Sequence, residues 1–312
     1  MKKSIVVFYS QAGSTQKVAK AIQRGIKRKT GQCDIVKLKE IKPEDLKKYQ
    51  LIGLGSPGWH SRPADPMQIF MENLPADNSK HYFFFCTHGS MPGPLVRETV
   101  AMLRKKGLTV IGGEDWYGSV FLPYMPKPFF TDGHPDDIDL QEAEKFGEEM
   151  AERSSRIFSG EIGLIPDEIL GKGFLQDAYV YDYEDTPAMR KELFESRSRP
   201  FKINEEKCTR CLLCVENCPS HTIDSSGPFP VFKTIECARC WYCEQICPTG
   251  AIEYDWEAVT RAMAKYDGTT KIEKELDIAE SKGYFRRLVP LKDVGKNTQW
   301  HKVSKHPRLK VP

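Results

Sequence analysis

The sequence predicts an α/β protein, in which a parallel sheet covered by helices is followed by a small cysteine-rich module. Over the first 160 residues, short apolar runs alternate with helix-like segments, a pattern typical of parallel strands joined by helical crossovers. Eight of the ten cysteines in this chain of 312 residues then fall between Cys208 and Cys247. This uneven distribution indicates a second module with its own chemistry.

Five apolar runs are the expected strands. The first, at residues 5–9, is β-branched and aromatic without polar alternation, so we expect a strand buried on both faces. The other four runs are residues 33–38, 51–55, 82–86 and 108–112. Each run is followed by a crossover, which predicts a five-stranded parallel sheet.

Four segments between these strands have the periodicity of helices. In residues 14–29, Val18, Ile22 and Ile26 recur at helical spacing. A helix over residues 139–158 would begin with an acidic turn, which suits the helix dipole. The two remaining helices are expected at residues 66–73 and 95–106.

Composition shifts divide the chain into four predicted parts. Residues 1–158 form the α/β domain, and residues 159–202 are expected to be a linker that lies on it and holds a short helix at 188–196. Residues 203–256 form an acidic module with 4 Lys/Arg against 8 Asp/Glu, and residues 257–312 form a basic extension with 13 against 7. The net charge of +3 hides this contrast and is too small to indicate nucleic acid as a partner.

Neither a membrane span nor a secretory signal is predicted. No run approaches the roughly 18 apolar residues of a transmembrane helix, and the apolar run at residues 5–9 is too short for a signal-peptide core. A cytoplasmic chain of this size does not need a disulfide framework. We therefore expect a cytoplasmic protein, in which Cys33 and Cys86 are small buried residues.

The remaining eight cysteines form two copies of one motif, C-x2-C-x2-C-x3-C-P, with 18 residues between the copies. This motif supplies thiolates for 4Fe-4S cubes, and its last cysteine ligates the other cluster. One predicted set is Cys208, Cys211, Cys214 and Cys247, and the other is Cys237, Cys240, Cys243 and Cys218. Structural zinc is the alternative, but zinc does not require the third cysteine or the Cys-Pro step.

A loop between the first strand and the first helix is a candidate phosphate site. Backbone amides and the helix dipole bind anions at this position, and the absence of a Gly-Lys-Ser/Thr step excludes a nucleotide triphosphate loop. A terminal monophosphate is therefore the better ligand, while a helix cap without a ligand is the alternative. The loop consists of Ser10, Gln11, Ala12, Gly13, Ser14 and Thr15.

Two further loops follow the third and fourth strands, at the edge where open α/β sheets bind ligands. Gly53 to Gly58 spell G-x-G-x-x-G, but the prolines that follow force an extended loop, so we reject a dinucleotide site. Instead, Trp59 is placed to stack on a flat ring, and Gly58 is able to flip its peptide. The candidate residues are Ser56, Pro57, Gly58 and Trp59 in one loop and Thr87, His88 and Gly89 in the other.

Residues 203–256 resemble the bacterial double-cluster ferredoxins, which implies two neighbouring 4Fe-4S clusters at low potential. Residues 1–158 resemble the flavodoxins through their three loops. That resemblance implies a five-stranded parallel sheet in the order 2-1-3-4-5 with FMN at its edge: the phosphate at Ser10 to Thr15, one flavin face against Ser56 to Trp59, and the pyrimidine edge at Thr87 to Gly89. The whole chain resembles the flavodoxin-ferredoxin fusion proteins of anaerobes.

One departure from the flavodoxins concerns the second flavin face. Residues 87–93 contain no aromatic side chain, so this face is expected to be open or covered by Trp116 or Tyr117. His88 is expected either at the flavin or in solvent, and His60 has the same alternatives.

Three functions compete at this stage. The first is an electron carrier that relays electrons between FMN, two 4Fe-4S clusters and redox protein partners. The second is an FMN-dependent reductase of a small substrate that uses the clusters as an internal wire, with His88 or His60 supplying a proton. The third is a regulatory iron-sulfur module acting through its basic extension, which also contains Trp300, His301 and His306. We expect that extension to wrap an acidic neighbour or to form a homodimer rather than to bind nucleic acid.

Overall fold

A computed structural model describes residues 3–59, 61–90, 92–123, 125–173, 201–233, 237–256 and 268–297. The expected helix at 188–196, and also His60, Trp300, His301 and His306, lie outside these residues. None of the described helices is long and apolar enough to span a membrane.

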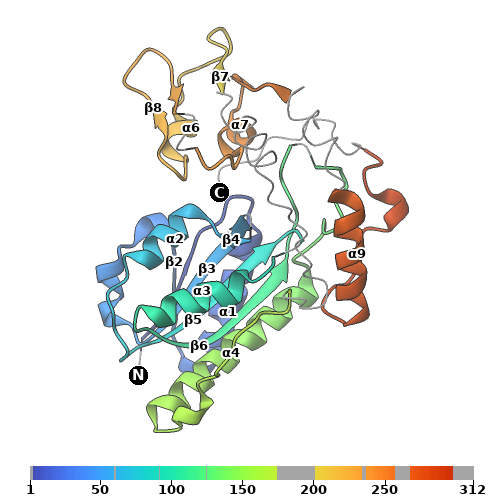
Figure 1. Cartoon of the computed structure of the whole chain (residues 1–312). Helices are drawn as coiled ribbons and strands as arrows, with labels where there is room; N and C mark the ends of the chain where they lie inside the picture. The colour runs from blue at the N-terminus through green and yellow to red at the C-terminus, as the bar shows by residue number, and fades with distance from the viewer. Residues whose placement is uncertain are drawn as a thin grey trace. The chain divides into compact units, whose positions relative to one another are not determined.

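The predicted parallel sheet is confirmed (Figure 1). Its strands run in the order β2-β1-β3-β5-β6, which is the order 2-1-3-4-5 once the short β4, an antiparallel partner of β3, is set aside. The interior strand β1 has Ile5, Val6 and Val7 fully buried, as expected of a strand covered on both faces. The bounds are β1 Ser4–Phe8, β2 Asp34–Lys37, β3 Leu51–Trp59, β4 Arg62–Pro63, β5 His81–His88 and β6 Thr109–Tyr117.

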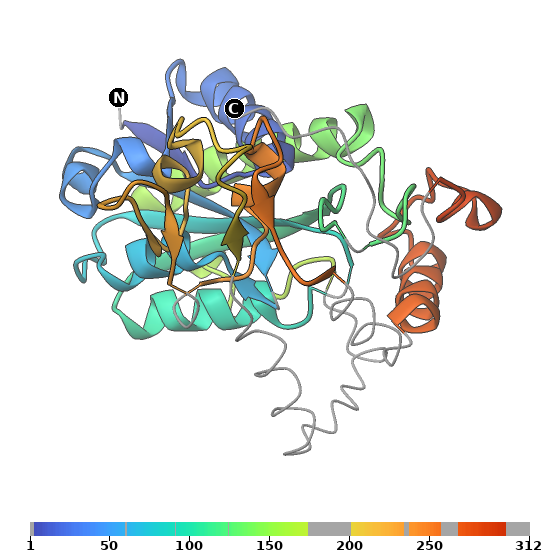
Figure 2. The same cartoon turned by 90° about the horizontal axis from the view of Figure 1, so that it is seen from above.

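Helices cover both faces of the sheet (Figure 2). On one face, α1 and α4 bury Val18, Ile22 and Met150 against the sheet. On the other face, α2 and α3 bury Met67 and Leu103. The bounds are α1 Ser14–Thr30, α2 Asp65–Glu72, α3 Leu95–Lys105 and α4 Asp137–Phe158, with short 3-10 helices at η1 Leu38–Glu40, η2 Pro43–Lys48 and η3 Ile162–Leu164.

The G-x-G pattern of β3 has a packing role. A Cβ atom at Gly53 would collide with the ring of Phe83, and one at Gly55 would collide with the ring of Phe85. Both rings belong to the neighbouring strand β5 and are fully buried. These two glycines make room for aromatic side chains, which agrees with the rejection of a dinucleotide site.

Two strands are longer than predicted. β3 continues to Trp59 and β6 to Tyr117, whereas the apolar runs end at residues 55 and 112. Pro, Gly, Asp and Glu are poor strand formers, but pairing with β5 carries both strands further, as far as Pro57↔Thr87 and His88↔Tyr117. The loops at the carboxyl edge therefore begin later than the sequence suggests.

The chain forms two compact units. Unit 1 contains the sheet and the described residues of Met1–Val120, Phe130–Tyr179 and Ile272–Val289. Unit 2 contains the described residues of Phe121–Phe129, Val180–Lys271 and Pro290–Pro312. Its elements are β7 Lys202–Ile203, α6 Leu213–Glu216, β8 Ile223–Asp224, β9 Val231–Phe232, α7 Tyr242–Ile246, β10 Ile252–Glu253 and η4 Leu291–Asp293.

Unit 2 has the small antiparallel pairings expected of the cysteine-rich module. Strand β10 pairs with β7, and β8 pairs with β9. Phe201 and Trp241 lie at the centre of its core, which also includes Leu122 from the segment that follows β6. The small α+β architecture predicted for the second domain is therefore confirmed.

Segments expected outside the α/β domain also belong to unit 1. In residues 159–173, Leu164 and Ile165 pack on the α1/α4 face, and Ile169 joins the core on the other face. From the basic extension, most of α9 Gly268–Ser281 and the residues up to Val289 belong to this unit, with Leu276 buried. Unit 1 is thus built from segments on both sides of the cysteine-rich module.

The contact between α1 and α4 depends on two glycines. A Cβ atom at Gly147 would collide with the Ile22 carbonyl, and one at Gly25 would collide with the Glu144 carbonyl. Gly147→Ala should therefore lower the free energy of unfolding by about 1–3 kcal/mol, because the helices must separate. Urea unfolding measures this change. The control is Gly163→Ala, where a Cβ atom meets nothing within 4 Å, and equal effects of both substitutions would contradict the packing account.

Candidate functional site

The loop after β1 presents hydrogen-bond donors at the amino end of α1. Ser10 Oγ accepts from the backbone N–H groups of Gly13 at 3.2 Å and Gln16 at 3.3 Å, which fixes the curvature of the loop. Gly13, the residue before the helix, has a left-handed backbone with φ 95°. The first turn of α1 contains no acidic residue, and Gln11 Nε2 is buried without a partner among the described residues. The loop therefore fits an anion.

The loop after β5 is tied to this first loop. The hydroxyls of Thr15 and Thr87 are 2.8 Å apart and buried. After β6, Gly118 packs so closely that an added Cβ atom would lie 3.1 Å from Ser14 Cβ and 3.7 Å from Thr87 Cβ. An added Cβ atom at Gly58 would lie 3.6 Å from His88 Cβ. The three predicted loops therefore converge at one edge of the sheet.

The loop after β3 is shaped from inside by Ser56. This residue is fully buried, and its hydroxyl accepts from Ala64 N–H at 2.9 Å and donates to the Pro57 carbonyl at 2.9 Å. Trp59, by contrast, is only partly buried, and its ring meets that of Tyr9 edge to face at 5.9 Å. Trp59 is thus not a core residue, and its partner Tyr9 was not predicted.

His88 lies in a buried pair with Asp115. Its side chain is 2% exposed, and Nε2 is 2.9 Å from the Asp115 carboxylate. The backbone N–H of Gly173 donates to both Asp115 oxygens, at 2.9 and 3.0 Å. His88 is therefore not a solvated side chain. The prediction missed Asp115 because the apolar run of β6 ends before it.

Burial dominates the titration of this region. It raises the pKa of Glu114 to about 7, with the Asp115 charge adding to the effect. Burial also raises the pKa of the Cys86 thiol well above its ordinary value and that of Cys33 to about 12. High thiol pKa values disfavour the reactive thiolate, which agrees with a packing role for both cysteines.

Of the two alternatives for the second flavin face, a cover by Trp116 or Tyr117 is disfavoured, because both side chains are buried in unit 1. Trp116 is buried in the core and packs edge to face on Phe146 of α4. Tyr117 is also buried, between His88 at 4.6 Å and Phe285 at 4.7 Å. Both side chains belong to the interior of unit 1.

All eight cysteines of the repeated motif are described, and they line two cavities in unit 2. The structure thus brings together the two sets that the sequence predicts, each with three cysteines of one motif and the last cysteine of the other. The first cavity is lined by Cys208, Cys211, Cys214 and Cys247, and the second by Cys218, Cys237, Cys240 and Cys243.

The backbone around each cavity repeats a strained conformation. Arg210 and Leu212 in the first motif have positive φ angles of 57° and 58°. Arg239 and Trp241, at the same positions of the second motif, have 53° and 61°. Residues with a left-handed backbone that alternate with right-handed ones form concave nests of N–H groups. Such nests bind anions and iron-sulfur clusters. Four side chains held at a conformational cost indicate a site that needs this geometry.

The thiols have environments suited to metal ligands. Burial raises the pKa of Cys214 to about 11 and that of Cys243 well above its ordinary value. At Cys247, burial opposes ionisation, but backbone donors, Ala251 N–H foremost, lower the pKa overall. Buried thiols with raised pKa values become thiolates when a metal supplies positive charge. The residues therefore fit iron-sulfur clusters.

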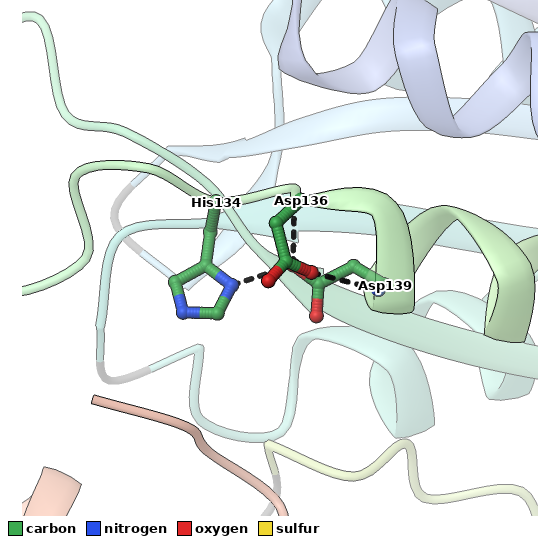
Figure 3. Close-up of side chains that lie close together, drawn as sticks. All are labelled: His134, Asp136 and Asp139. Atoms are coloured by element: carbon green, nitrogen blue, oxygen red, sulfur yellow. Dashed lines mark hydrogen bonds and ion pairs between the residues drawn. The ribbon is translucent and has the colours of Figure 1, made fainter. Parts of the chain in front are cut away.

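A separate group of side chains lies at the start of α4 (Figure 3). His134, Asp136 and Asp139 have ligand atoms within 4.8 Å of one another. However, Arg286 donates to Asp136 at 2.6 and 2.7 Å and to Asp139 at 2.8 Å, and the His134 ring bonds the Arg286 carbonyl at 2.8 Å. Because Arg286 already supplies the positive charge, we interpret this group as a clasp that holds the C-terminal segment on unit 1.

The clasp bears on the role of the basic extension. Arg286 and its neighbour Arg287 both pair with acids of unit 1, the latter with Asp277 and Glu280. Arg286 thus pairs with acids of the α/β domain, whereas the partners of Arg287 lie within the C-terminal extension itself.

Comparison with known proteins gives two domain matches. The flavodoxin family model matches residues 6–113, and the model of the 4Fe-4S binding domain matches residues 201–224, which contain the first cysteine motif. No curated protein matches the chain.

Several solved structures resemble about half of the chain. A flavodoxin from the domain Archaea is 27% identical and covers 49% of this chain and 99% of its own, with a TM-score of 0.41. Oxidised flavodoxin 1 from Bacillus cereus is 19% identical, with coverages of 48% and 98% and a TM-score of 0.39. Rubredoxin:oxygen oxidoreductase from the anaerobe Desulfovibrio gigas is 11% identical, with coverages of 51% and 38% and a TM-score of 0.42.

The two domain matches define the class: an electron-transfer protein with a flavodoxin domain and a 4Fe-4S binding domain. The flavodoxin domain implies FMN, and the 4Fe-4S binding domain implies an iron-sulfur cluster.

Removing the clasp should destabilise unit 1 in a pH-dependent way. Arg286 hydrogen bonds hold the pKa of Asp136 well below its usual range, so this stability is present above the unfolded pKa of about 3.9 and is lost as the pH falls below it. At pH 7, Arg286→Ala should cost about 1–2 kcal/mol of unfolding free energy, allowing for partial exposure. Chemical unfolding at pH 7 and pH 3 measures the change, which should be smaller at the lower pH because part of this stability has been lost there.

Lys274→Ala, which removes the same charge from exposed α9, is the control and should have little effect. A rise in the unfolding temperature of the unsubstituted protein on addition of zinc, abolished by Asp139→Asn, would contradict the clasp and favour a cation site.

Proposed function

We propose that this protein relays electrons within one chain, between FMN in unit 1 and two 4Fe-4S clusters in unit 2, and exchanges them with redox proteins. One observation carries the proposal: two cavities, each lined by four cysteines and bordered by a left-handed pair, occur in the same chain as a flavodoxin domain. With a single cluster, one set of four cysteines would have no metal to bind.

In this proposal the two cysteine sets are the cluster ligands. Cys208, Cys211, Cys214 and Cys247 hold one cluster, and Cys218, Cys237, Cys240 and Cys243 hold the other. The thiols lose their protons on binding. The left-handed residues turn backbone N–H groups toward the sulfurs, and such donors tune the potential.

The three converging loops would hold FMN. Ser10, Gln11, Ala12, Gly13, Ser14 and Thr15 would bind the phosphate through backbone and side-chain donors at the amino end of α1. Pro57, Gly58 and Trp59 would contact the flavin, while Ser56 shapes their loop. Thr87, His88 and Gly89 would lie at its pyrimidine edge, with the buried His88–Asp115 pair as support beneath the loop.

The covalent arrangement suits a relay. When bound, FMN exchanges one or two electrons and each cluster exchanges one. The chain passes from unit 1 to unit 2 and back twice, and then enters unit 2 again, so the two cofactor-binding units share a high effective concentration.

The alternative, an FMN-dependent reductase with an internal wire, needs a proton donor that a small substrate can reach. His88 is buried and bonded to Asp115, and His60 lies outside the described residues. The environment of His88 therefore favours the relay. A reductase would consume a small substrate when supplied with reduced clusters, whereas a relay turns over only with protein partners.

Iron content tests the cluster assignment. Anaerobically purified protein should contain about eight irons and one FMN per chain. Cys208→Ser/Cys247→Ser alters ligands of one proposed cluster and should retain about four irons, whereas Cys208→Ser/Cys218→Ser alters both clusters and should lose nearly all of them. Elemental analysis and FMN release measure these contents, with Cys33→Ser as the control.

The reverse outcome, with the 208/218 pair retaining more iron, would show that each motif holds its own cluster. Zinc in place of iron, with no flavin, would contradict the whole proposal.

Two glycines of α1 test the phosphate site. Gly13 before the helix and Gly31 after it both have positive φ, and an added Cβ atom meets nothing within 4 Å at either position. Gly13→Ala and Gly31→Ala should each cost about 1–2 kcal/mol of stability through backbone strain. Only Gly13→Ala should also weaken FMN binding, by about tenfold, because it reorients the amides. Quenching of FMN fluorescence measures this affinity, and equal affinities of the two variants would exclude the loop as the phosphate site.

A further inference from the structure

The two cysteine motifs repeat in sequence but differ in exposure. Leu212 and Trp241 occupy the same position of the repeat and share the left-handed conformation, yet Leu212 is 39% exposed and Trp241 is 6% exposed. In the short helices that follow, α6 buries none of its residues, whereas α7 buries Tyr242, Gln245 and Ile246. The loop of the first motif thus faces solvent, and that of the second does not.

Side chains of unit 2 cover the second motif. Trp241 stacks on Trp256 at 5.0 Å and meets Tyr254 edge to face at 4.6 Å. Gln245 Nε2 donates to the Phe121 carbonyl at 2.6 Å. Phe121 follows Tyr117, the last residue of β6, by four residues, so the covering segment is continuous with the sheet of the flavodoxin domain. The second cavity is therefore covered by side chains of its own unit.

The first cavity has an open, partly apolar border. Cys211 is the one exposed cysteine among the eight, all of which are described. Leu212 and Pro230 line this cavity, and Val231, next to Pro230, is 62% exposed. A cluster ligand and apolar side chains at the surface are suited to brief contact with another protein.

Charge indicates the kind of partner. Among the described residues of 201–256, exposed carboxylates outnumber exposed cations. The partner should therefore present a positive surface. The exposed carboxylates are Glu205, Glu206, Glu216, Asp224, Glu253 and Asp255, and the exposed cations are Lys202, Lys207, Arg210 and Lys233.

We infer that the exposed loop of the first motif, residues 208–216, is the docking surface for an external one-electron carrier protein with a positively charged face. In the step at this surface, one electron leaves the reduced cluster and lowers the oxidation state of the acceptor metal by one. The cluster is the one held by Cys208, Cys211, Cys214 and Cys247. No bond forms or breaks, and no proton moves. This inference rests on the proposed function.

Cytochrome c, a strongly basic one-electron haem protein, is a suitable probe. Full-length protein loaded with iron and sulfide, with and without FMN, is reduced and mixed with Fe(III) cytochrome c in a stopped-flow instrument. Glu216→Lys should slow the appearance of Fe(II) haem at least about threefold at low ionic strength, an effect that salt reduces. The control Glu149→Lys makes the same charge change on exposed α4 of unit 1 and should leave the rate unchanged.

The two repeat-related positions provide a second test. Leu212→Trp places at the first cavity the side chain that covers the second, and should also slow the reaction about threefold or more. Equal rates for Glu216→Lys and Glu149→Lys would overturn the inference. So would a rate that responds to Trp241→Leu but not to Leu212→Trp, because electrons would then leave through the second motif. A wild-type chain without iron would instead contradict the proposed function.

Discussion

The parallel order of the sheet is the constraint on which the flavodoxin domain depends. Because β1, β3 and β5 are adjacent and parallel, their carboxyl ends meet at one edge, and three loops distant in sequence converge there. The buried bond between the Thr15 and Thr87 hydroxyls joins two of these loops across 72 residues. A one-residue change of register would turn Thr87 to the opposite face of the sheet and separate the loops.

Backbone conformation has the equivalent role in the cysteine-rich unit. A small domain with few strands cannot position eight thiols by core packing alone. The left-handed residues Arg210, Leu212, Arg239 and Trp241 curve each motif around its cavity, and the crossing of Cys218 and Cys247 joins the two motifs. In the proposed clusters, the free energy of metal binding would offset the strain in the free chain, as expected where metal binding contributes to folding.

The sequence predicted the features that depend on local spacing. Strand positions and the grouping of cysteines follow from apolar runs and a repeated motif, whereas the sheet order was implied by the resemblance to the flavodoxins, and the structure agrees on each. Features that depend on pairing between distant segments were missed. Asp115 lies on a part of β6 that is rich in glycine and acidic residues, which are poor strand formers. Only the hydrogen-bonded pairing with β5 extends the strand β6 to this position. Likewise, composition indicated a basic C-terminal extension, but not that Arg286 would join Asp136 and Asp139.

The difference in solvent exposure between the two motifs could not be predicted from the sequence either. Leu212 and Trp241 occupy equivalent positions, and only the packing of Trp256 and Tyr254 decides that one is covered. In the proposed relay, this asymmetry makes the first motif the contact site for an external partner.

The central claim is that electrons move between clusters and flavin inside one molecule. The direct test is to add a substoichiometric pulse of reductant to the fully loaded protein and to follow flavin and cluster absorbance over a tenfold range of protein concentration. A redistribution that is first order, with a rate independent of protein concentration, is the predicted result. A rate that rises in proportion to protein concentration would contradict the claim, because electrons would then pass only between molecules.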